Sequence, residues 1–295
     1  MAGMRRAYLL GLSVAVVAGC GGDEPCETCV GGSGGDANAA GGGSSTSGWT
    51  TLIDAPWQLE PFSEHPADEH TLELTRDIVV GGIRPIAPKG THHTLLRLDG
   101  GEVTNTVYAS GVGTNELMFP PGVGLRLRKG QLLRLELHLF NPQAEPLSGS
   151  SGIEVVELDE AEVEHDAEIV LAGPLALDIL PNAETTTSGT CTVESEQRVF
   201  ALFPHMHQLG THFKTTLTVG GTENVLHDAP YAFDHQAFYS FDPIAMAPGD
   251  TVESECTWVN PTSNVVGWGE SSEAEMCFSI LYRYPAGLPG SLCVQ

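Results

Sequence analysis

The sequence predicts an all-β protein built mainly of antiparallel strands. Short segments of alternating apolar and polar residues recur along the chain, separated by Gly, Pro, Asn and Asp. No long segment has the periodicity of a helix. After the N-terminal region roughly 245 residues remain, which suits two domains with a core each better than one sandwich.

The clearest predicted strand covers residues 131–139. Four leucines there alternate with Arg134, Glu136 and His138. Because successive side chains of a strand point to opposite faces, the leucines are expected to pack inward and His138 to lie on the other face. Further strands are expected at residues 94–98, 124–128, 152–158, 168–171, 198–203, 214–219, 251–259 and 276–282. An acidic stretch at 157–166 predicts a domain boundary near His165, giving domains 49–165 and 166–295.

The first twenty residues have the pattern of an export signal. Arg5 and Arg6 precede an apolar run at 7–18 that is too short to span a bilayer. The end of this run, Val17-Ala18-Gly19-Cys20, resembles a bacterial lipobox, which implies a signal peptide at 1–19, cleavage before Cys20 and lipidation of Cys20. An ordinary secretory peptide with an incidental Cys is the alternative.

Residues 20–48 are dominated by Gly, Ser, Ala and Asn, a composition that predicts a flexible tether. We therefore expect an exported lipoprotein that is anchored to a membrane through Cys20, on the periplasmic face or the cell surface.

The net charge limits the possible binding partners, and the cysteine content predicts disulfides. The formal net charge is −25, which excludes nucleic acid as a partner. Of the seven cysteines, Cys191, Cys256, Cys277 and Cys293 are expected to form disulfides after export. Cys26 and Cys29 lie in the tether and receive no function.

Histidine and methionine residues form the candidate metal sites. His92 and His93 are adjacent, His138 lies on the alternating strand, and His205 and His207 are separated by one residue. Residues two apart on a strand project from one face, so His205 and His207 could share a metal. Adding Met276 favours copper, because a thioether suits Cu(I) and imidazole suits copper generally.

The chain resembles the copper type II, ascorbate-dependent monooxygenases, which include peptidylglycine alpha-hydroxylating and dopamine beta-monooxygenases. Six motifs occur in the family's order: Thr91-His-His-Thr-Leu-Leu96, Phe119-Pro-Pro-Gly-Val-Gly-Leu125, Leu133-Arg-Leu-Glu-Leu-His-Leu-Phe-Asn-Pro142, His205-Met-His-Gln-Leu-Gly210, Pro248-Gly-Asp250 leading to Cys256, and Glu275-Met-Cys277.

The resemblance implies two tandem antiparallel jelly-roll-like β-sandwich domains that face each other across a cleft and hold two copper ions per chain. One copper, the electron-supplying site, would be held by His92, His93 and His138. The other, where O2 binds and the substrate is attacked, would be held by His205, His207 and Met276. Joint ligation by the adjacent His92 and His93 requires a bend or a strand end there.

The resemblance also implies two disulfides, Cys256 with Cys277 and Cys191 with Cys293. Two departures stand out. The domain at 49–165 contains no Cys, and where the peptide-processing enzyme binds a glycine carboxylate this chain has Phe203, Phe278 and Ile280. Peptides that end in glycine are therefore expected to be poor substrates.

We therefore expect a copper-dependent monooxygenase that hydroxylates a C–H bond of a small organic substrate with O2 and a reductant such as ascorbate. A non-catalytic copper-binding lipoprotein that buffers periplasmic copper is the main alternative. A structural zinc protein is disfavoured because methionine is a poor zinc ligand.

Overall fold

A computed structural model describes residues 48–98, 105–271, 273–288 and 292–294. The predicted signal peptide at 1–19, Cys20 and nearly all of the tether lie outside the described residues. The predicted all-β fold is confirmed, since the described part of the chain is built of strands and contains no α-helix. No helix among these residues is long and apolar enough to cross a membrane.

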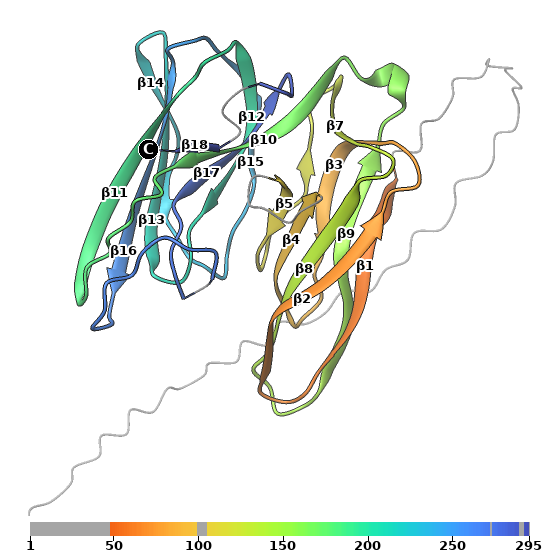
Figure 1. The fold of residues 1–295 in the computed structure, drawn as a ribbon, viewed down its shortest axis with the longest axis vertical. Helices are drawn as coiled ribbons and strands as arrows, with labels where there is room; N and C mark the ends of the chain where they lie inside the picture. Colours follow the sequence, from red (N-terminus) through yellow and green to blue (C-terminus); the bar gives the residue numbers. More distant parts are fainter. Residues whose placement is uncertain (1–47, 99–104, 272, 289–291, 295) are drawn as a thin grey trace, which may run out of the picture. The chain divides into compact units, whose positions relative to one another are not determined.

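The first sandwich comprises two sheets (Figure 1). One sheet has the order β1-β9-β3-β7, with β6 beside β3, and the other has the order β2-β8-β4-β5. Their strands are β1 (Trp49–Leu59), β2 (Ser63–Glu73), β3 (Ile78–Ile86), β4 (Thr91–Leu98), β5 (Thr106–Ser110), β6 (Leu117–Met118), β7 (Val123–Leu127), β8 (Leu132–Asn141) and β9 (Leu147–Glu157).

The leucines of β8 form the centre of the first core, as the alternating pattern predicts. Leu133, Leu135, Leu137 and Leu139 are each fully buried, whereas His138 is half-buried on the other face. They pack in one cluster with Ile53 of β1 and Ile153 of β9, which belong to the opposite sheet. Burial of one face of each sheet therefore fixes which side of β8 presents His138.

The second sandwich repeats this arrangement with the sheets β10-β17-β12-β15 and β11-β16-β13-β14, and with β18 beside β10. Its strands are β10 (His165–Gly173), β11 (Ala183–Thr192), β12 (Gln197–His205), β13 (Gly210–Val219), β14 (Thr222–Pro230), β15 (Tyr239–Met246), β16 (Thr251–Asn260), β17 (Phe278–Tyr284) and β18 (Leu292–Val294). Each strand expected from the sequence overlaps an observed one.

The two sandwiches are continuous through one sheet. Strands β7 and β10 pair in parallel, with His165 opposite Val123, so that the sheets on either side of this pair form a single ten-stranded sheet. The described residues from Gly48 onward form one compact unit. The proposed domain boundary near His165, the first residue of β10, stays a prediction.

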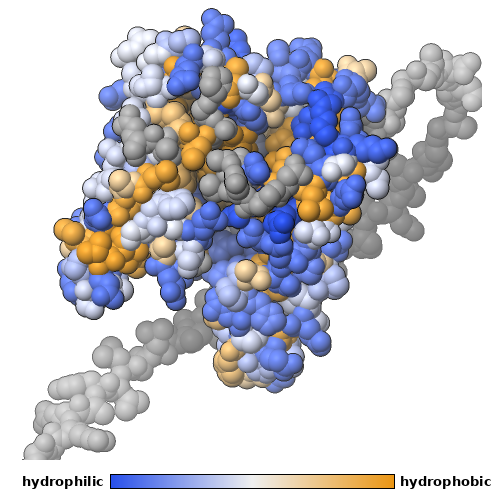
Figure 2. All heavy atoms as spheres, in the orientation of Figure 1, coloured by the Kyte–Doolittle hydropathy of each residue, from blue (hydrophilic) through white to orange (hydrophobic). Residues whose placement is uncertain are grey.

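The surface in the view of Figure 2 is largely hydrophilic, in keeping with the high acidic content. A hydrophobic region is visible at the lower left, where Figure 1 has the turns beside β11 and β16. The exposed apolar residues Leu180, Val259 and Val265 belong to these turns and strand ends.

Candidate metal centres

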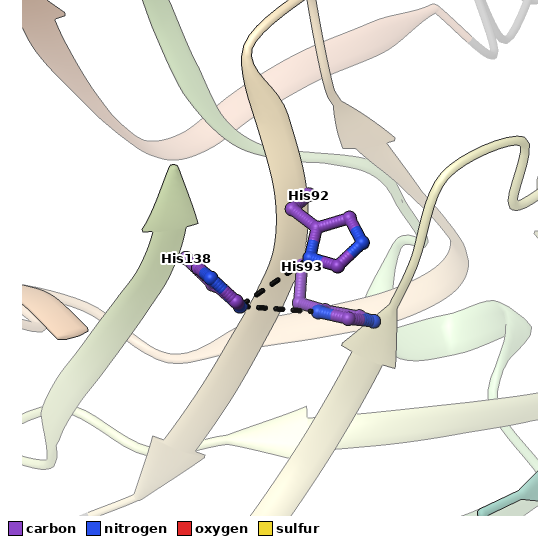
Figure 3. A group of neighbouring side chains, drawn as sticks. All are labelled: His92, His93 and His138. Carbon is purple, nitrogen blue, oxygen red and sulfur yellow. Dashed lines mark hydrogen bonds between the residues drawn. The ribbon is translucent and has the colours of Figure 1, made fainter. Parts of the chain in front are cut away.

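His92, His93 and His138 converge in the first sandwich (Figure 3), and their ligand atoms lie within 4.8 Å of one another. In the pairing of β4 with β8, Thr91 faces Leu139 and His93 faces His138, which leaves His92 as the extra residue of a β-bulge. A β-bulge changes the direction of a side chain, so two consecutive side chains can point toward the same side of a strand. The bend that the sequence requires for joint ligation is therefore present.

The Nδ1 atoms of this group point toward one another. His138 Nδ1 lies 3.4 Å from His92 Nδ1 and 3.5 Å from His93 Nδ1. Nitrogens bound to one metal at about 2 Å are about 3 to 4 Å apart, so these separations suit a shared ion. On its other side, His138 Nε2 lies 2.6 Å from a carboxylate oxygen of Glu64. Because that carboxylate accepts a hydrogen bond from the ring N–H at Nε2, the neutral ring has no proton on Nδ1. His138 Nδ1 is therefore available as a metal ligand.

His205 and His207 form the second group. His205 ends β12, while His207 lies in the following turn, so the pair does not share a regular strand as the sequence pattern alone suggested. Their ring centroids are still only 5.1 Å apart, with the rings nearly perpendicular. The strand end therefore brings the two imidazoles together by a different local geometry.

In both His205 and His207, the ring nitrogen Nδ1 has a hydrogen-bond partner. His207 Nδ1 lies 2.9 Å from the carbonyl oxygen of Ala274, which can only accept. His205 Nδ1 lies 3.1 Å from Oε1 of Gln236. Both rings therefore carry their proton on Nδ1 and keep Nε2 free for a metal.

A buried carboxylate organises the turn that carries His207. Glu275 is fully buried, and its oxygens accept from the backbone N–H of His207 at 2.9 Å, the backbone N–H of Leu209 at 2.7 Å and the indole N–H of Trp258 at 3.0 Å. Burial raises the pKa of Glu275, and these donors oppose that rise. Glu275, which precedes Met276 in the sequence, thus holds the turn that carries His207.

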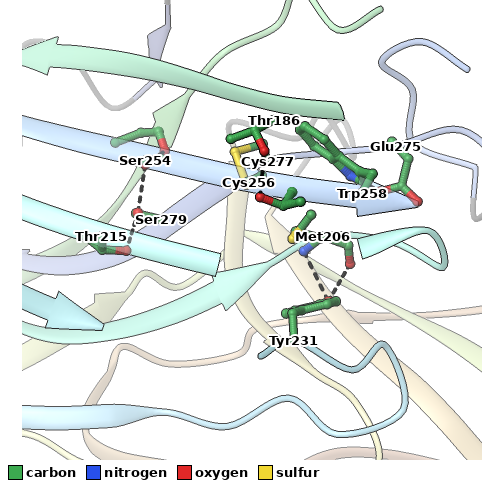
Figure 4. The surroundings of a disulfide bond; sticks show 12 residues. Thr186, Met206, Thr215, Tyr231, Ser254, Cys256, Trp258, Glu275, Cys277 and Ser279 are labelled. Carbon is green, nitrogen blue, oxygen red and sulfur yellow. Dashed lines mark hydrogen bonds between the residues drawn. A yellow bond between two sulfur atoms is a disulfide. The ribbon is translucent and has the colours of Figure 1, made fainter. Parts of the chain in front are cut away.

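The structure contains both disulfides that the family resemblance implies, Cys256 with Cys277 and Cys191 with Cys293. Figure 4 shows the first beside Trp258 and Glu275. Since Cys277 follows Met276 directly, this bond ties the backbone of Met276 to β16.

Both histidine groups line one cavity of about 160 Å³. Its polar lining includes His93, His138, His205 and His207, and the Met276 side chain contributes to the same wall. His92, His93 and His138 could together hold a metal ion, and the cavity also brings the imidazoles of His205 and His207 together with Met276, donor types that suit copper.

The rest of the cavity wall is largely apolar. Phe203, Phe278 and Ile280 line it and are buried. Arg97 also lines it, but its guanidinium lies 3.0 Å from Glu136 and 3.3 Å from Glu270. Its positive charge is therefore matched by two carboxylates at the cavity edge.

Burial favours the neutral form of His92, His93, His205 and His207. Desolvation lowers the pKa of His93 to about 2 and the pKa of His205 to about 3, and it also lowers the pKa of His92 and His207. Neighbouring imidazoles lower the first two further. Because only a neutral imidazole binds a metal, these rings are ready for ligation at neutral pH.

Three orienting residues were not identified from the sequence: Glu64, Gln236 and Glu275. Glu275 belongs to the motif Glu275-Met-Cys277, but the sequence assigned it no role. The positions of Glu64 and Gln236 in the sequence have no regular spacing relative to the histidines. Their roles depend on contacts across 74, 31 and 68 residues of chain, which no local pattern encodes.

Comparison with known families finds a match in the C-terminal part of the chain. The family model for the C-terminal domain of the copper type II ascorbate-dependent monooxygenases matches residues 165–295. No curated protein matches the chain. The matched residues, which include His205, His207 and Met276, are thus similar to the C-terminal domain of the copper type II ascorbate-dependent monooxygenases.

Proposed function

We propose that this chain is a monooxygenase that uses two copper ions, O2 and an external reductant such as ascorbate to hydroxylate a C–H bond of a small organic substrate. The observation that carries the proposal is the single cavity lined by both histidine groups and by Met276. A protein that only stored copper would not need two unlike donor sets around one space. The family of residues 165–295 supports the same chemistry.

In this proposal His92, His93 and His138 hold the electron-supplying copper. His205, His207 and Met276 hold the copper at which the substrate is attacked. When bound, copper would supply one-electron redox chemistry and O2 activation, which protein side chains alone do not provide. The net reaction takes the C–H bond, O2, two electrons and two protons to an alcohol and water.

The protein's own residues would bind and orient the substrate. Phe203, Phe278 and Ile280 offer an apolar wall that keeps water from the reacting bond. Arg97 is already matched by Glu136 and Glu270, so a substrate carboxylate would find no uncompensated positive charge there. We therefore expect peptides that end in glycine to be turned over poorly.

Export and membrane anchoring remain part of the proposal. They rest on the pattern from Arg5 to Cys20 and on the composition of the tether at 20–48. A small-molecule substrate, O2 and a lipid membrane are the proposed partners.

Two variants test the assignment of roles. Met276→Ile keeps an apolar side chain of similar volume but removes the sulfur donor, so the fold should persist while reductant-driven O2 consumption collapses. His138→Ala should also abolish turnover, but it should leave the His205, His207 and Met276 site able to bind Cu(I). Carbon monoxide binding to the reduced protein, followed by infrared spectroscopy, separates the two.

We expect His138→Ala to retain the carbon monoxide band of the wild-type protein and Met276→Ile to lose or shift it. Full O2 consumption by both variants would refute the assignment. Copper binding at both sites without any reductant-dependent O2 uptake, across a panel of small amines, phenethyl compounds and amides, would instead favour the copper-buffering lipoprotein.

A further inference from the structure

The segment between β14 and β15, residues 231–238, lies between the two histidine groups and is fastened to the first sandwich. Thr114 Oγ1 donates to the carbonyl oxygen of Gln236 at 2.7 Å. Asn115 and Phe238 exchange two hydrogen bonds, of 3.2 Å and 2.8 Å. We call residues 231–238 the bridging segment, because it belongs to the second sandwich by sequence and is held by the first.

The side-chain amide of Gln236 contacts both groups. It is 3% exposed, and its Oε1 lies 3.1 Å from His205 Nδ1 while its Nε2 lies 3.4 Å from His93 Nε2. Nε2 also lies 2.9 Å from the carbonyl oxygen of Phe233. That carbonyl can only accept, so it must face the amide NH₂ group. The amide is thereby oriented, and its Oε1 accepts from His205 Nδ1.

His93 completes the arrangement. Its Nδ1 points at the first centre, 3.5 Å from His138 Nδ1, so a metal bound there requires the ring proton on Nε2. Since Gln236 Nε2 is also a donor, its contact with His93 Nε2 is then not a hydrogen bond. His93 has a backbone hydrogen bond to Phe233. A carbonyl oxygen has two lone pairs, so the carbonyl of Phe233 can accept from His93 and from Gln236 together.

We infer that Gln236 is a positioning residue shared by both metal centres: it holds His205 directly and His93 through the carbonyl of Phe233, each in the tautomer that presents its free nitrogen to the metal. The ring of Phe233 reinforces this, since its centroid lies 4.5 Å from that of His93 and 6.1 Å from that of His207. One short segment thus orients a ligand in each sandwich.

This inference rests on the two centres of the proposed function but not on turnover, so it is tested by metal affinity and ring tautomer. Gln236→Leu removes both the acceptor and the donor at nearly constant volume. Loss of a group that orients a metal-bound histidine costs about 10- to 100-fold in metal affinity. We expect the Cu(I) affinity of each centre to fall by about tenfold or more.

The affinity of each centre is measured by competition with a Cu(I) chelator. The second centre is measured alone in a His138→Ala background, and the first alone in a His207→Ala background. The matched control is Gln197→Leu, which replaces another buried glutamine, one that contacts Arg283 and Met246. It should leave both affinities unchanged.

Nitrogen-15 NMR of the metal-free protein gives a readout that a merely structural role would not move. His205 should carry its proton on Nδ1 in the wild type and lose this preference in Gln236→Leu. Gln236→Glu keeps an acceptor and should restore it. An effect on only one centre, no effect on either, an equal effect of Gln197→Leu, or an unchanged His205 tautomer would each overturn the inference. If the variants gave all the expected affinities and tautomers but the wild-type protein hydroxylated no substrate, the proposed function would be refuted and the inference about Gln236 would stand.

Discussion

The imidazole rings of the two candidate centres are oriented by groups that are distant in sequence. Glu64 faces His138, the carbonyl of Ala274 faces His207, and Gln236 faces His205. In each case the oxygen of the partner accepts a hydrogen bond from one ring N–H. The other ring nitrogen is then unprotonated and can bind a metal. The first group presents Nδ1 and the second Nε2, which agrees with the positions of these partners.

Glu64 offers a direct test of this selection. Glu64→Ala removes the acceptor from His138 Nε2, and we expect the Cu(I) affinity of the first centre to fall by about tenfold, while that of the second stays unchanged. Chelator competition measures both. Glu69→Ala is the matched control, because Glu69 lies on the same strand and pairs with Arg134 away from the histidines. If Glu69→Ala lowered the Cu(I) affinity of the first centre as much as Glu64→Ala does, the loss of a negative charge alone would explain both results.

Glu275 is predicted to matter for both stability and the second centre. Glu275→Gln turns one of its two acceptors into a donor that faces a backbone N–H, so the free energy of unfolding should fall by about 2 kcal/mol. The Cu(I) affinity of the second centre should fall as well. Denaturant unfolding and chelator competition measure the two effects, with the exposed Glu273→Gln as control. Wild-type values for both would contradict the role assigned to this carboxylate.

The candidate ligands themselves could be identified from sequence, whereas their supports could not. His138 lies in a period-two pattern, and His205 and His207 are separated by one residue, so a local pattern marks them. Glu64 lies in β2, an exposed and polar strand whose sequence has no clear alternation. Its contact with His138 arises only when β2 pairs with β8, which is a property of the fold.

At the scale of elements, several strands with one buried face were predicted from the sequence, whereas others were not, among them β1, whose buried and exposed residues also alternate. Strand β8 alternates strictly between buried and less buried residues, and the leucine pattern encodes this. Strands β2 and β14 are largely exposed and polar, and β11 is rich in threonine, so apolar periodicity does not mark them. Their pairing with neighbouring strands decides their conformation.

The β-bulge at His92 illustrates how an element can create a site. The sequence requires a bend at two adjacent histidines that bind one metal, but it does not say which kind of bend. The register shift between Thr91 and His93 supplies it while the rest of β4 stays paired with β8. The centre therefore depends on one irregular position in an otherwise regular strand.

The two disulfides should differ in what they support. Replacing Cys256 and Cys277 by alanine opens a loop of about 20 residues and should lower the free energy of unfolding by about 3 kcal/mol. The same change at Cys191 and Cys293 opens a loop of about 100 residues and should cost about 4 to 5 kcal/mol. Denaturant titrations of the metal-free variants give both values.

Only the first pair should affect the second centre, because Cys277 adjoins Met276. We expect the variant that lacks Cys256 and Cys277 to show a broadened or shifted carbon monoxide band. The variant that lacks Cys191 and Cys293 should keep the wild-type band. Identical bands in the two variants would mean that the backbone of Met276 is held by other contacts.

At the scale of the whole molecule, the two sandwiches share a core as well as a sheet. One cluster of buried residues includes Leu135 and Tyr108 of the first sandwich and Phe203, Phe238 and Tyr282 of the second. The buried hydroxyl of Tyr282 donates to the carbonyl oxygen of Val107 at 3.1 Å. Parallel pairing of β7 with β10 continues the backbone hydrogen bonds across the same boundary.

This continuity predicts that residues 48–295 unfold as one cooperative unit. Leu135→Ala removes a fully buried side chain from the first sandwich and should cost about 2 to 5 kcal/mol. If unfolding is shared, hydrogen exchange through global opening should accelerate equally in β8 and in β16 of the second sandwich, by about 30-fold or more. Mass spectrometry of peptides from the two strands measures this. Faster exchange in β8 alone would show that each sandwich opens by itself, and the cavity between the histidine groups would then be free to open without unfolding of the second sandwich.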